Sequence, residues 1–491
     1  MLFTDNIYER NLIMKKIIAL ALALLMVFAL VGCKSNKREV VKITLSTEDS
    51  EAILAAAGIR LPDVTEAAGA NSVVTWYGWY DPFQNYSEDE IVNTGYFTFQ
   101  EKYGCSLEWI ECDYFERNDM LATLVLSSNS PDITQAGYGA TATFPLDCIK
   151  GMYVPVDNYV DYENDPLWNG IAMADYYKLG NKHFAFVVDI DPSNVVCYNK
   201  RVMDEWGFDD PAELYYNDEW TWDVFYDMCM DFTDGDENRY ALDGYAYNGG
   251  FVESTGQMYL GKDENGMFYS NIDAPEIERA QTVLYDLIKN DCAYHEGSNR
   301  WALRGDFGTG MKDGLCLFYV IGTSFFTGTV EDISAVWGDM EAGEVMFAPL
   351  PRDPNGDGNY YMASGPVGYM LISGGDNHDG AALLAKCVRF KLIDPTVIDI
   401  DRKQLEEIYL WNDDMLAMYD EQFEIAERHP VVNYTGNLQT ALNNALSSLS
   451  DGINRSAQPS TYGQLKENNR ETIDYYIEEL NGMILDYEEA E

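Results

Sequence analysis

Short apolar runs alternate with amphipathic stretches along the first half of the chain. Residues 73–76 (Val-Val-Thr-Trp) form a run typical of a buried strand that ends at Gly78, and residues 105–111 predict a second strand. Apolar positions recur at helical spacing over 88–103 and over 115–126, which predicts a helix after each strand. Strands that alternate with helices are typical of βαβ units. The pattern therefore predicts an α/β fold with a parallel sheet.

The same alternation resumes farther along the chain and then gives way to helix alone. Thr221 precedes an amphipathic stretch, and its side chain can accept a hydrogen bond from the first turn of a helix there. The elements expected in this part are strands at 180–189, 195–200 and 314–320 and helices at 275–290 and 464–485. The chain is thus expected to hold two αβ regions followed by a helical C-terminal part.

The N-terminal segment has the parts of a secretory signal peptide. Residues 15–16 (Lys-Lys) precede the apolar residues 17–30, and the segment ends in Leu-Val-Gly-Cys at Cys33. The apolar run is shorter than the ~20 residues that a transmembrane helix needs. The ending resembles a bacterial lipobox, which implies that the Cys33 thiol receives a diacylglycerol, that residues 1–32 are removed and that Met14 is the true start.

Residues 33–70 are expected to be a flexible, lipid-anchored tether. They are rich in Ser, Thr, Glu, Ala and Lys and show no strongly amphipathic pattern, so order is expected to begin near Asn71. Acyl chains contribute about 0.8 kcal/mol for each buried CH₂, which is enough to hold a large domain at a membrane. The body is therefore predicted to lie on the extracellular face of the cell membrane, and a single-membrane bacterium is the favoured source.

Composition and charge narrow the class of ligand. The 491 residues suffice for two domains, and a hydrophobic content of 47% is typical of a globular protein. The chain has 35 Tyr and 10 Trp, whose rings suit both half-buried positions and surfaces that stack on polyhydroxylated ligands. A net charge of −50 argues against nucleic acid as a partner, because binding it requires Lys and Arg to neutralise phosphates. The ligand is expected to be neutral or cationic.

Nine cysteines are present, Cys33 and eight others. Export permits disulfides, but the eight show no tight spacing and several lie within apolar stretches. Buried free thiols are therefore favoured over disulfides.

Several short motifs, in this order, resemble the family 1 extracellular solute-binding proteins, the sugar-binding lipoproteins of ABC importers. They are Ser130-Pro-Asp-Ile133, Val187-Val-Asp189 with Val195-Val-Cys-Tyr-Asn-Lys200, Trp220-Thr-Trp-Asp-Val-Phe225, the Gly-rich block 307–326, and Phe347-Ala-Pro-Leu-Pro351 with Ser364-Gly-Pro-Val-Gly368. Each motif alone is weak, but their order and spacing cover nearly all of residues 71–390.

The resemblance implies two αβ lobes with a ligand cleft between them and a helical C-terminal part. The expected segments are lobe 1 at 71–190, lobe 2 at 191–345, a return to lobe 1 at 346–376 and C-terminal helices at 377–491, mostly packed on lobe 2. It also implies a monomeric body that needs no cofactor, is not an enzyme, captures a mono- or oligosaccharide by lobe closure and delivers it to permease subunits in the membrane. Domain-interface clefts and hinge closure are both general features of binding proteins.

Candidate ligand-binding residues follow the ends of the predicted strands. Trp79, Tyr80 and Asp81 come directly after the first strand, where open αβ sheets bind ligands. An aromatic ring for the C–H face of a sugar beside a carboxylate for its hydroxyls suits a carbohydrate. The further candidates are Tyr138 on a glycine-flanked loop, Asp189 and Asp191 in the crossover, and Trp301, Phe325 and Phe326 in the second lobe. Core packing and local capping are the alternative roles for these side chains.

One acidic loop resembles a calcium site. Asp234, Asp236 and Asn238 place oxygens at alternate positions, but the Glu expected at the twelfth position is missing, so a tight turn is favoured. No other metal or cofactor site is expected. The near-miss P-loop at 256–262 is followed by Asp263 where Ser or Thr should bind magnesium.

Two other functions stay open at this point. With 82 acidic residues, a pair of carboxylates at the spacing of a glycoside hydrolase cannot be dismissed by counting. A peptide or polyamine binder on the same fold would also suit the acidic surface.

Overall fold

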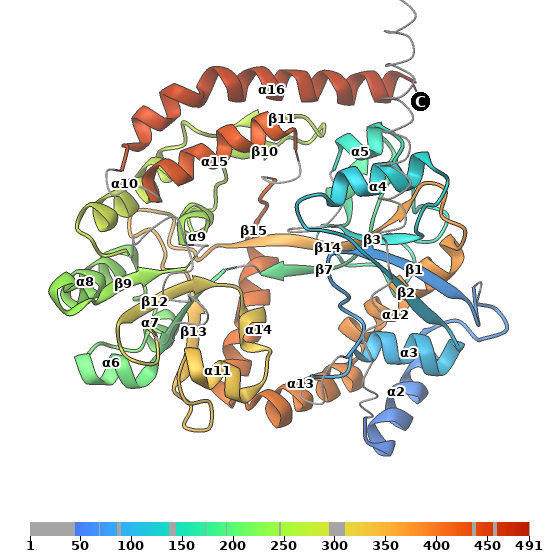
Figure 1. The fold of residues 1–491 in the computed structure, drawn as a ribbon, viewed down its shortest axis with the longest axis horizontal. Coiled ribbons are helices and arrows are strands. Elements are labelled where there is room, and N and C mark those ends of the chain that lie inside the picture. The colour runs from blue at the N-terminus through green and yellow to red at the C-terminus, as the bar shows by residue number, and fades with distance from the viewer. Residues whose placement is uncertain are drawn as a thin grey trace, which may run out of the picture.

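The computed structural model describes residues 45–67, 69–85, 90–136, 144–171, 173–192, 194–244, 247–293, 310–434, 438–454 and 459–490. Met14, Cys33 with the signal segment, Tyr138 and Trp301 lie outside the described residues. Two α/β lobes lie side by side, and strands β7 (Phe186–Pro192) and β14 (Met362–Ile372) run across the middle of the molecule (Figure 1). The predicted two-lobe α/β fold is confirmed.

Lobe 1 is built on a sheet with the order β15-β14-β3-β1-β2, in which β4 and β7 also pair with β14. Strand β1 runs parallel to both β2 and β3, as the alternation of strands and helices predicted. Besides β7 and β14, the strands of this sheet are β1 (Val73–Gly78), β2 (Ser106–Glu111), β3 (Ile133–Ala136), β4 (Tyr153–Val154) and β15 (Pro430–Val431). The helices that follow β2 and β3 are α4 (Arg117–Leu126) and α5 (Leu146–Ile149).

The core of lobe 1 lies between its sheet and two packed helices, α3 (Thr94–Tyr103) and α12 (His378–Ile393). Asn93 caps the start of α3 by accepting a hydrogen bond from the Tyr96 amide. The helix ends at Gly104, whose φ of 68° is left-handed and favours glycine. Trp76 and Phe99 are fully enclosed in this core.

Lobe 2 is built on a smaller sheet with the order β13-β8-β12-β9. Its strands are β8 (Val195–Asn199), β9 (Tyr240–Asp243), β12 (Cys316–Ile321) and β13 (Val345–Pro349), and every residue of β8, β12 and β13 is buried. The helices around it are α6 (Lys200–Trp206), α7 (Pro211–Tyr216), α8 (Trp222–Phe232), α9 (Tyr247–Glu253), α10 (Pro275–Lys289) and α11 (Val330–Val336). Thr221 caps α8 as predicted, because its side chain accepts from the Val224 amide.

Two small hairpins and three short helices complete the lobes. The hairpins are β5 (Lys178–Leu179) with β6 (Lys182–His183) and β10 (Leu260–Lys262) with β11 (Phe268–Ser270). The 3-10 helices are η1 (Ala174–Tyr177), η2 (Gly235–Glu237) and η3 (Thr323–Phe326).

The chain crosses between the lobes at β7, at β14 and again after β15, where it leaves the sheet of lobe 1 for α15, which packs on α10. It enters lobe 2 after β7, close to the predicted boundary. The predicted return at residue 346 is wrong, because Val345–Pro349 pairs antiparallel with β8 inside the sheet of lobe 2. The return to lobe 1 begins with β14, which pairs antiparallel with β7 from Ser364 to Tyr369.

The C-terminal helices divide between the lobes. Helices α12 and α13 (Pro395–Tyr409) contact α3, α2 and β7, so the prediction that this part packs mostly on lobe 2 is wrong for them. Helix α14 (Asp413–Arg428) contacts β7, β13 and β14 and so lies at the junction. Helices α15 (Thr440–Asn454) and α16 (Tyr462–Ala490) pack on each other and on α10, and α16 runs along the top of the molecule toward α5 (Figure 1).

Part of the predicted tether is folded. Residues 47–60 form α2 (Thr47–Arg60), which packs on α3 and α13, so the expectation that order begins near Asn71 is wrong. The helix buries only Ile53 and Ala57, which explains why its apolar pattern is weak. It is held by tertiary contacts, including an ion pair of 2.6 Å between Arg60 and Asp394.

The eight cysteines other than Cys33 are all buried and free, which confirms the preference for buried thiols. None of the described helices combines the length and the apolar character that a membrane span requires.

Candidate functional site

A cavity of about 420 Å³ lies between the two lobes. Its walls include the carboxyl end of β3 (Gln135 and Ala136) and the turn after β12 (Gly322 to Ser324). The junction strands supply Asp191, Ala363 and residues 365–367. The cavity thus lies where strands of both lobes end, which is the usual ligand position in open αβ sheets. We call it the inner cavity.

The floor of the inner cavity is the middle of β14. This strand pairs with β15 at Met362 and Ala363 and with β3 from Gly368 to Leu371. Residues 364–367 lie between these two pairings, and three of them, Gly365 to Val367, line the cavity. The pairing between β7 and β14 has an irregularity at Val367/Gly368, in the same place. The ligand space therefore rests on the segment that joins the lobes.

Asp191 is the predicted residue that the structure places in the inner cavity. Its side chain is exposed to the cavity, and within the described chain no hydrogen bond or ion pair engages its carboxylate. Desolvation by the surrounding walls, together with the nearby Asp189, raises the pKa of Asp191 to about 6. Water in the cavity still reaches this carboxylate, so its ionised form costs less than that of an enclosed acid.

Glu253 is a second carboxylate in the inner cavity and is buried at the end of α9. Asn194 donates a hydrogen bond of 2.7 Å to its Oε2. Burial raises the pKa of Glu253 to about 7, against the opposing hydrogen bonds from Asn194 and Asn433. Glu253, Asn194 and Asn433 all line the cavity. Through its hydrogen bonds to the two asparagines, Glu253 connects α9 of lobe 2 to the segments after β7 and after β15.

Aromatic side chains form another part of the wall. Trp411 is only 3% exposed, and its indole N–H donates to the Phe326 carbonyl at 2.9 Å. Its ring lies 5.4 Å from that of Tyr419, which also lines the cavity. On the opposite lobe, the Tyr177 hydroxyl donates to the Pro366 carbonyl at 3.3 Å. Rings beside carboxylates and amides suit a ligand with apolar faces and hydroxyl groups.

The described part of the lining carries no basic side chain. Asp191 and Glu253 are acidic, and none of the described residues around the cavity is Lys, Arg or His. This fits the expectation of a neutral or cationic ligand from the overall charge.

Two other predicted residues lie next to the inner cavity without lining it. The Tyr80 hydroxyl donates a hydrogen bond of 2.6 Å to Gln135 Oε1, so Tyr80 positions a residue of the wall. Asp189 lies on the same face of β7 as Asp191, two residues away. Burial raises its pKa to about 6, in spite of the nearby Arg389.

Four predicted residues are placed elsewhere. Asp81 is buried and accepts a hydrogen bond from the Phe83 amide, as in a local turn. Phe326 is fully enclosed, with its ring 5.6 Å from that of Phe347, and Phe325 packs against the same core. Trp79 is 42% exposed and packs against Tyr80 and Tyr114, outside the inner cavity. These four side chains do not line the inner cavity, and their role in ligand binding stays a prediction.

The acidic loop at Asp234 forms a tight turn. The Asp234 side chain accepts from the amides of Asp236 and Glu237 and pairs with Arg239 at 3.1 Å. Asn238 adopts a left-handed φ of 56° that closes the turn. Among the described residues no group of three His, Cys, Asp or Glu side chains is placed to hold a metal ion.

Sequence reasoning missed Gln135, Glu253, Trp411 and Tyr419. Gln135 could have been found, because it lies in the strand that begins at Ile133 and points to the same sheet edge as Trp79. The other three come from helices and a connection far along the chain, and no local pattern marks them.

Comparison with known proteins identifies similar chains. Residues 97–387 match the family model of the bacterial extracellular solute-binding proteins. No curated protein sequence matches the chain. Similar solved folds include the galacto-N-biose-/lacto-N-biose I-binding protein of Bifidobacterium longum, with a TM-score of 0.60, 14% identity and coverage of 84% of this chain and 98% of that chain.

Two further solved structures share the fold. One is an ABC substrate-binding protein of Listeria monocytogenes in complex with cycloalternan, with a TM-score of 0.58, 16% identity and coverage of 82% of this chain and 98% of that one. The other is the GacH receptor of Streptomyces glaucescens, solved with acarbose, with a TM-score of 0.56, 17% identity and coverage of 82% and 99%. At these identities the likeness is one of fold.

Proposed function

The chain belongs to the bacterial extracellular solute-binding proteins, and on this premise we propose that it captures a carbohydrate for an ABC importer. As a solute-binding protein it is a receptor and not an enzyme, which removes the glycoside hydrolase from consideration. The similar folds from Bifidobacterium, Listeria and Streptomyces were solved with lacto-N-biose, cycloalternan and acarbose. Their ligands support a carbohydrate as the solute.

The observation that carries the proposal is the composition of the inner cavity. Tyr419 offers a ring surface and packs against the buried Trp411, while Gln135, Asp191 and Asn194 offer hydrogen-bonding groups. Because Asp191 has no partner among the described residues, it is free to accept hydrogen bonds from sugar hydroxyls. A volume of about 420 Å³ lies within the usual range of small-molecule sites.

Capture would proceed by closure of the lobes about β7 and β14. A ligand on residues 365–367 would contact the junction itself and both lobes, so it would bind the closed arrangement more tightly than the open one. That difference in affinity is what shifts a protein between two arrangements. The closed, loaded form would then dock on permease subunits in the membrane.

Lipid anchoring at Cys33 is the second part of the proposal. Because the ending at Cys33 resembles a lipobox, the Cys33 thiol would carry a diacylglycerol. This lipid would hold the body at the extracellular face of the membrane. Helix α2, Thr47–Arg60, lies within the 33–70 segment that composition predicted to be a tether. A Cys33→Ala variant should leave the membrane fraction and appear in the medium, whereas unchanged membrane retention would contradict the anchor.

A cationic solute is the alternative that a specific observation favours. The described lining has two carboxylates and no basic side chain, which suits an ammonium group as well as hydroxyls. Polyamines and basic peptides therefore belong in the same ligand panel as sugars.

Titration calorimetry at pH 7.5 against this panel tests the proposal. We expect stoichiometric binding of a carbohydrate without any product, and a loss of about tenfold or more in affinity for Asp191→Asn, since hydrogen bonds to charged groups contribute about 1.5–3 kcal/mol. Asp399→Asn is the matched control, because Asp399 is exposed on α13 and is not among the residues that line the inner cavity. Binding of polyamines alone, or of no sugar at all, would refute the carbohydrate assignment.

A further inference from the structure

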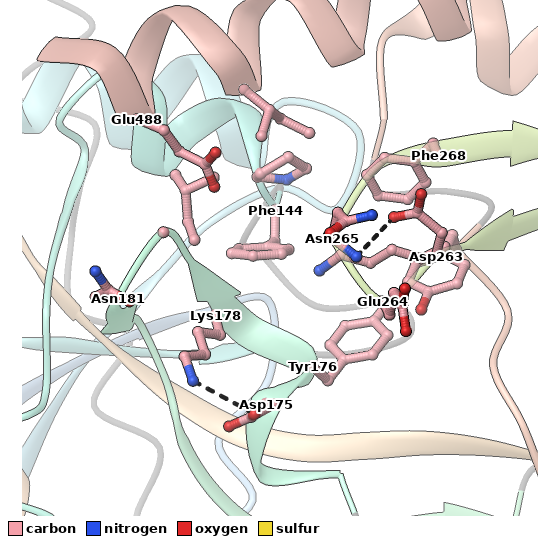
Figure 2. A pocket seen from close by; sticks show the side chains of 17 residues that line it. Phe144, Asp175, Tyr176, Lys178, Asn181, Asp263, Glu264, Asn265, Phe268 and Glu488 are labelled. Carbon is pink, nitrogen blue, oxygen red and sulfur yellow. Dashed lines mark hydrogen bonds and ion pairs between the residues drawn. The ribbon is translucent and has the colours of Figure 1, made fainter. Parts of the chain in front are cut away.

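A second cavity of about 390 Å³ lies between the lobes next to α16 (Figure 2). Lobe 1 contributes Phe144, Asp175, Tyr176 and residues 178–181, and lobe 2 contributes residues 262–266 and Phe268 of the β10–β11 hairpin. Ile484 and Glu488 of α16 also line it. Figure 2 shows the hairpin residues on one side of the space and Lys178 and Asn181 on the other. We call it the outer cavity.

The outer and inner cavities are neighbours. Tyr176 lines both, and the consecutive residues Asn433 and Tyr434 line the inner and the outer cavity respectively. The rings of Tyr176 and Tyr434 are stacked, with centroids 5.2 Å apart and an angle of 5° between their planes. This pair joins lobe 1 to the segment after β15, so it belongs to the wall between the two cavities.

The polar lining of the outer cavity combines donors and acceptors. Two lysines and two asparagines can donate, and four carboxylates can accept. An anion would meet the four carboxylates, and a cation would meet the two lysines. A neutral ligand with many hydroxyl groups can use both kinds of partner. The rings of Phe144, Tyr176, Phe268 and Tyr434 supply apolar faces beside them.

Lys262 is the most informative of these polar groups. Its Nζ lies 5.4 Å from the ring centroid of Phe144 in lobe 1 and 5.9 Å from that of Phe268 in lobe 2. Within the described chain its ammonium has no hydrogen-bond acceptor and no ion pair, and desolvation lowers its pKa. A desolvated donor without an acceptor is unfavourable. A sugar hydroxyl in the outer cavity would supply that acceptor.

Each cavity is large enough for sugar rings. A cavity of about 150 Å³ holds a benzene molecule, and the two cavities measure about 420 and 390 Å³. A monosaccharide would leave one of them to water.

We propose that the outer cavity is a second sugar subsite, so that the solute is an oligosaccharide that occupies both cavities. The proposal rests on the proposed carbohydrate function and specifies its ligand class. The Tyr176–Tyr434 pair parts to admit the linking unit, and each ring then offers a face to it. Lys262 and the end of α16 contact the outer unit, while Asp191 contacts the inner one.

Calorimetry with oligosaccharides and their own constituent mono- and disaccharides tests the subsite. The panel contains malto-, cello- and lacto-series sugars of one to five units. We expect at least one oligosaccharide to bind tenfold or more tightly than its constituent disaccharide. Lys262→Met and Tyr434→Ala should remove this gain while leaving affinity for the shortest ligand within about twofold. Asp191→Asn should weaken short and long ligands alike.

Lys289→Met is the matched control for Lys262→Met. Lys289 also lies over an aromatic ring, that of Tyr285 at 5.6 Å, but it is exposed on α10 away from both cavities. Thermal unfolding of each variant establishes that it is folded, and Lys262→Met alone decides the question if Tyr434→Ala does not fold. A constituent that binds as tightly as its oligosaccharide overturns the outer subsite but leaves the carbohydrate receptor intact. If no sugar of the panel binds, both proposals fall.

Discussion

Replacing Glu253 by Gln removes a buried charge while keeping the size of the side chain. Burial raises the pKa of Glu253 from 4.5 to about 7. The folded protein therefore binds this proton more tightly than the unfolded chain does. The sign follows from proton linkage: the contribution of Glu253 to stability is complete below pH 4.5 and is lost as the pH rises through 7.

The magnitude follows from the same change in pKa. At about 1.36 kcal/mol for each pKa unit, the ionised Glu253 carboxylate costs the folded state about 3 kcal/mol above pH 7. Gln offers one carbonyl oxygen to the two amide donors Asn194 and Asn433, which loses about 1 kcal/mol at every pH. We expect Glu253→Gln to be more stable than the wild type by about 2 kcal/mol at pH 8 and less stable by about 1 kcal/mol at pH 4.

Urea unfolding of both proteins from pH 4 to pH 8 measures this change of sign in the difference between their free energies of unfolding. The difference between the two proteins isolates Glu253 from Asp189 and Asp191, which titrate in the same range and are unchanged. Glu101→Gln, on the exposed face of α3, is the control and should track the wild type at every pH. A difference between Glu253→Gln and the wild type that stays constant from pH 4 to pH 8 would show that the charge of Glu253 has no part in stability.

Three further predictions follow from the fold. Phe326→Ala should lower the free energy of unfolding by about 3–5 kcal/mol, because its ring is enclosed, whereas Trp79→Ala should cost less than about 1 kcal/mol; urea unfolding distinguishes them, and equal losses would contradict their placement. Deletion of residues up to 60 should lower the melting temperature, since burial of Ile53 alone contributes about 1.5–3 kcal/mol; an unchanged melting temperature would mean that α2 does not stabilise the domain. The eight buried thiols should react with a thiol reagent only after unfolding, and rapid labelling of the native protein would contradict their burial.

Local chemistry explains what could be predicted from the sequence. The strands at 73–78 and 195–199 follow from apolar runs of the right length, and the start of α8 follows from Thr221, whose hydroxyl accepts within its own turn. Asp191 was found because it ends a strand that resembled a family crossover. Each of these inferences depends on residues that are neighbours in the chain.

What could not be predicted depends on contacts between distant segments. Val345–Pro349 has the same apolar character as a strand of either lobe, and only its pairing with β8 assigns it to lobe 2. Helix α2 is stabilised by α3 and α13, so its own sequence gives a weak signal. Trp411 lines the inner cavity because its indole is held by the Phe326 carbonyl, 85 residues away.

Helix α16 has a practical consequence for measuring the motion of this receptor. It packs on α15, α10 and β11, yet its last turns contact α5 and line the outer cavity beside Gly180 of lobe 1. A dye attached near Glu489 would therefore sit over one lobe while moving with the other. Paired with a second dye at the exposed Lys150, it would convert lobe closure into a change of energy transfer, which makes the C-terminus a natural position for a biosensor label.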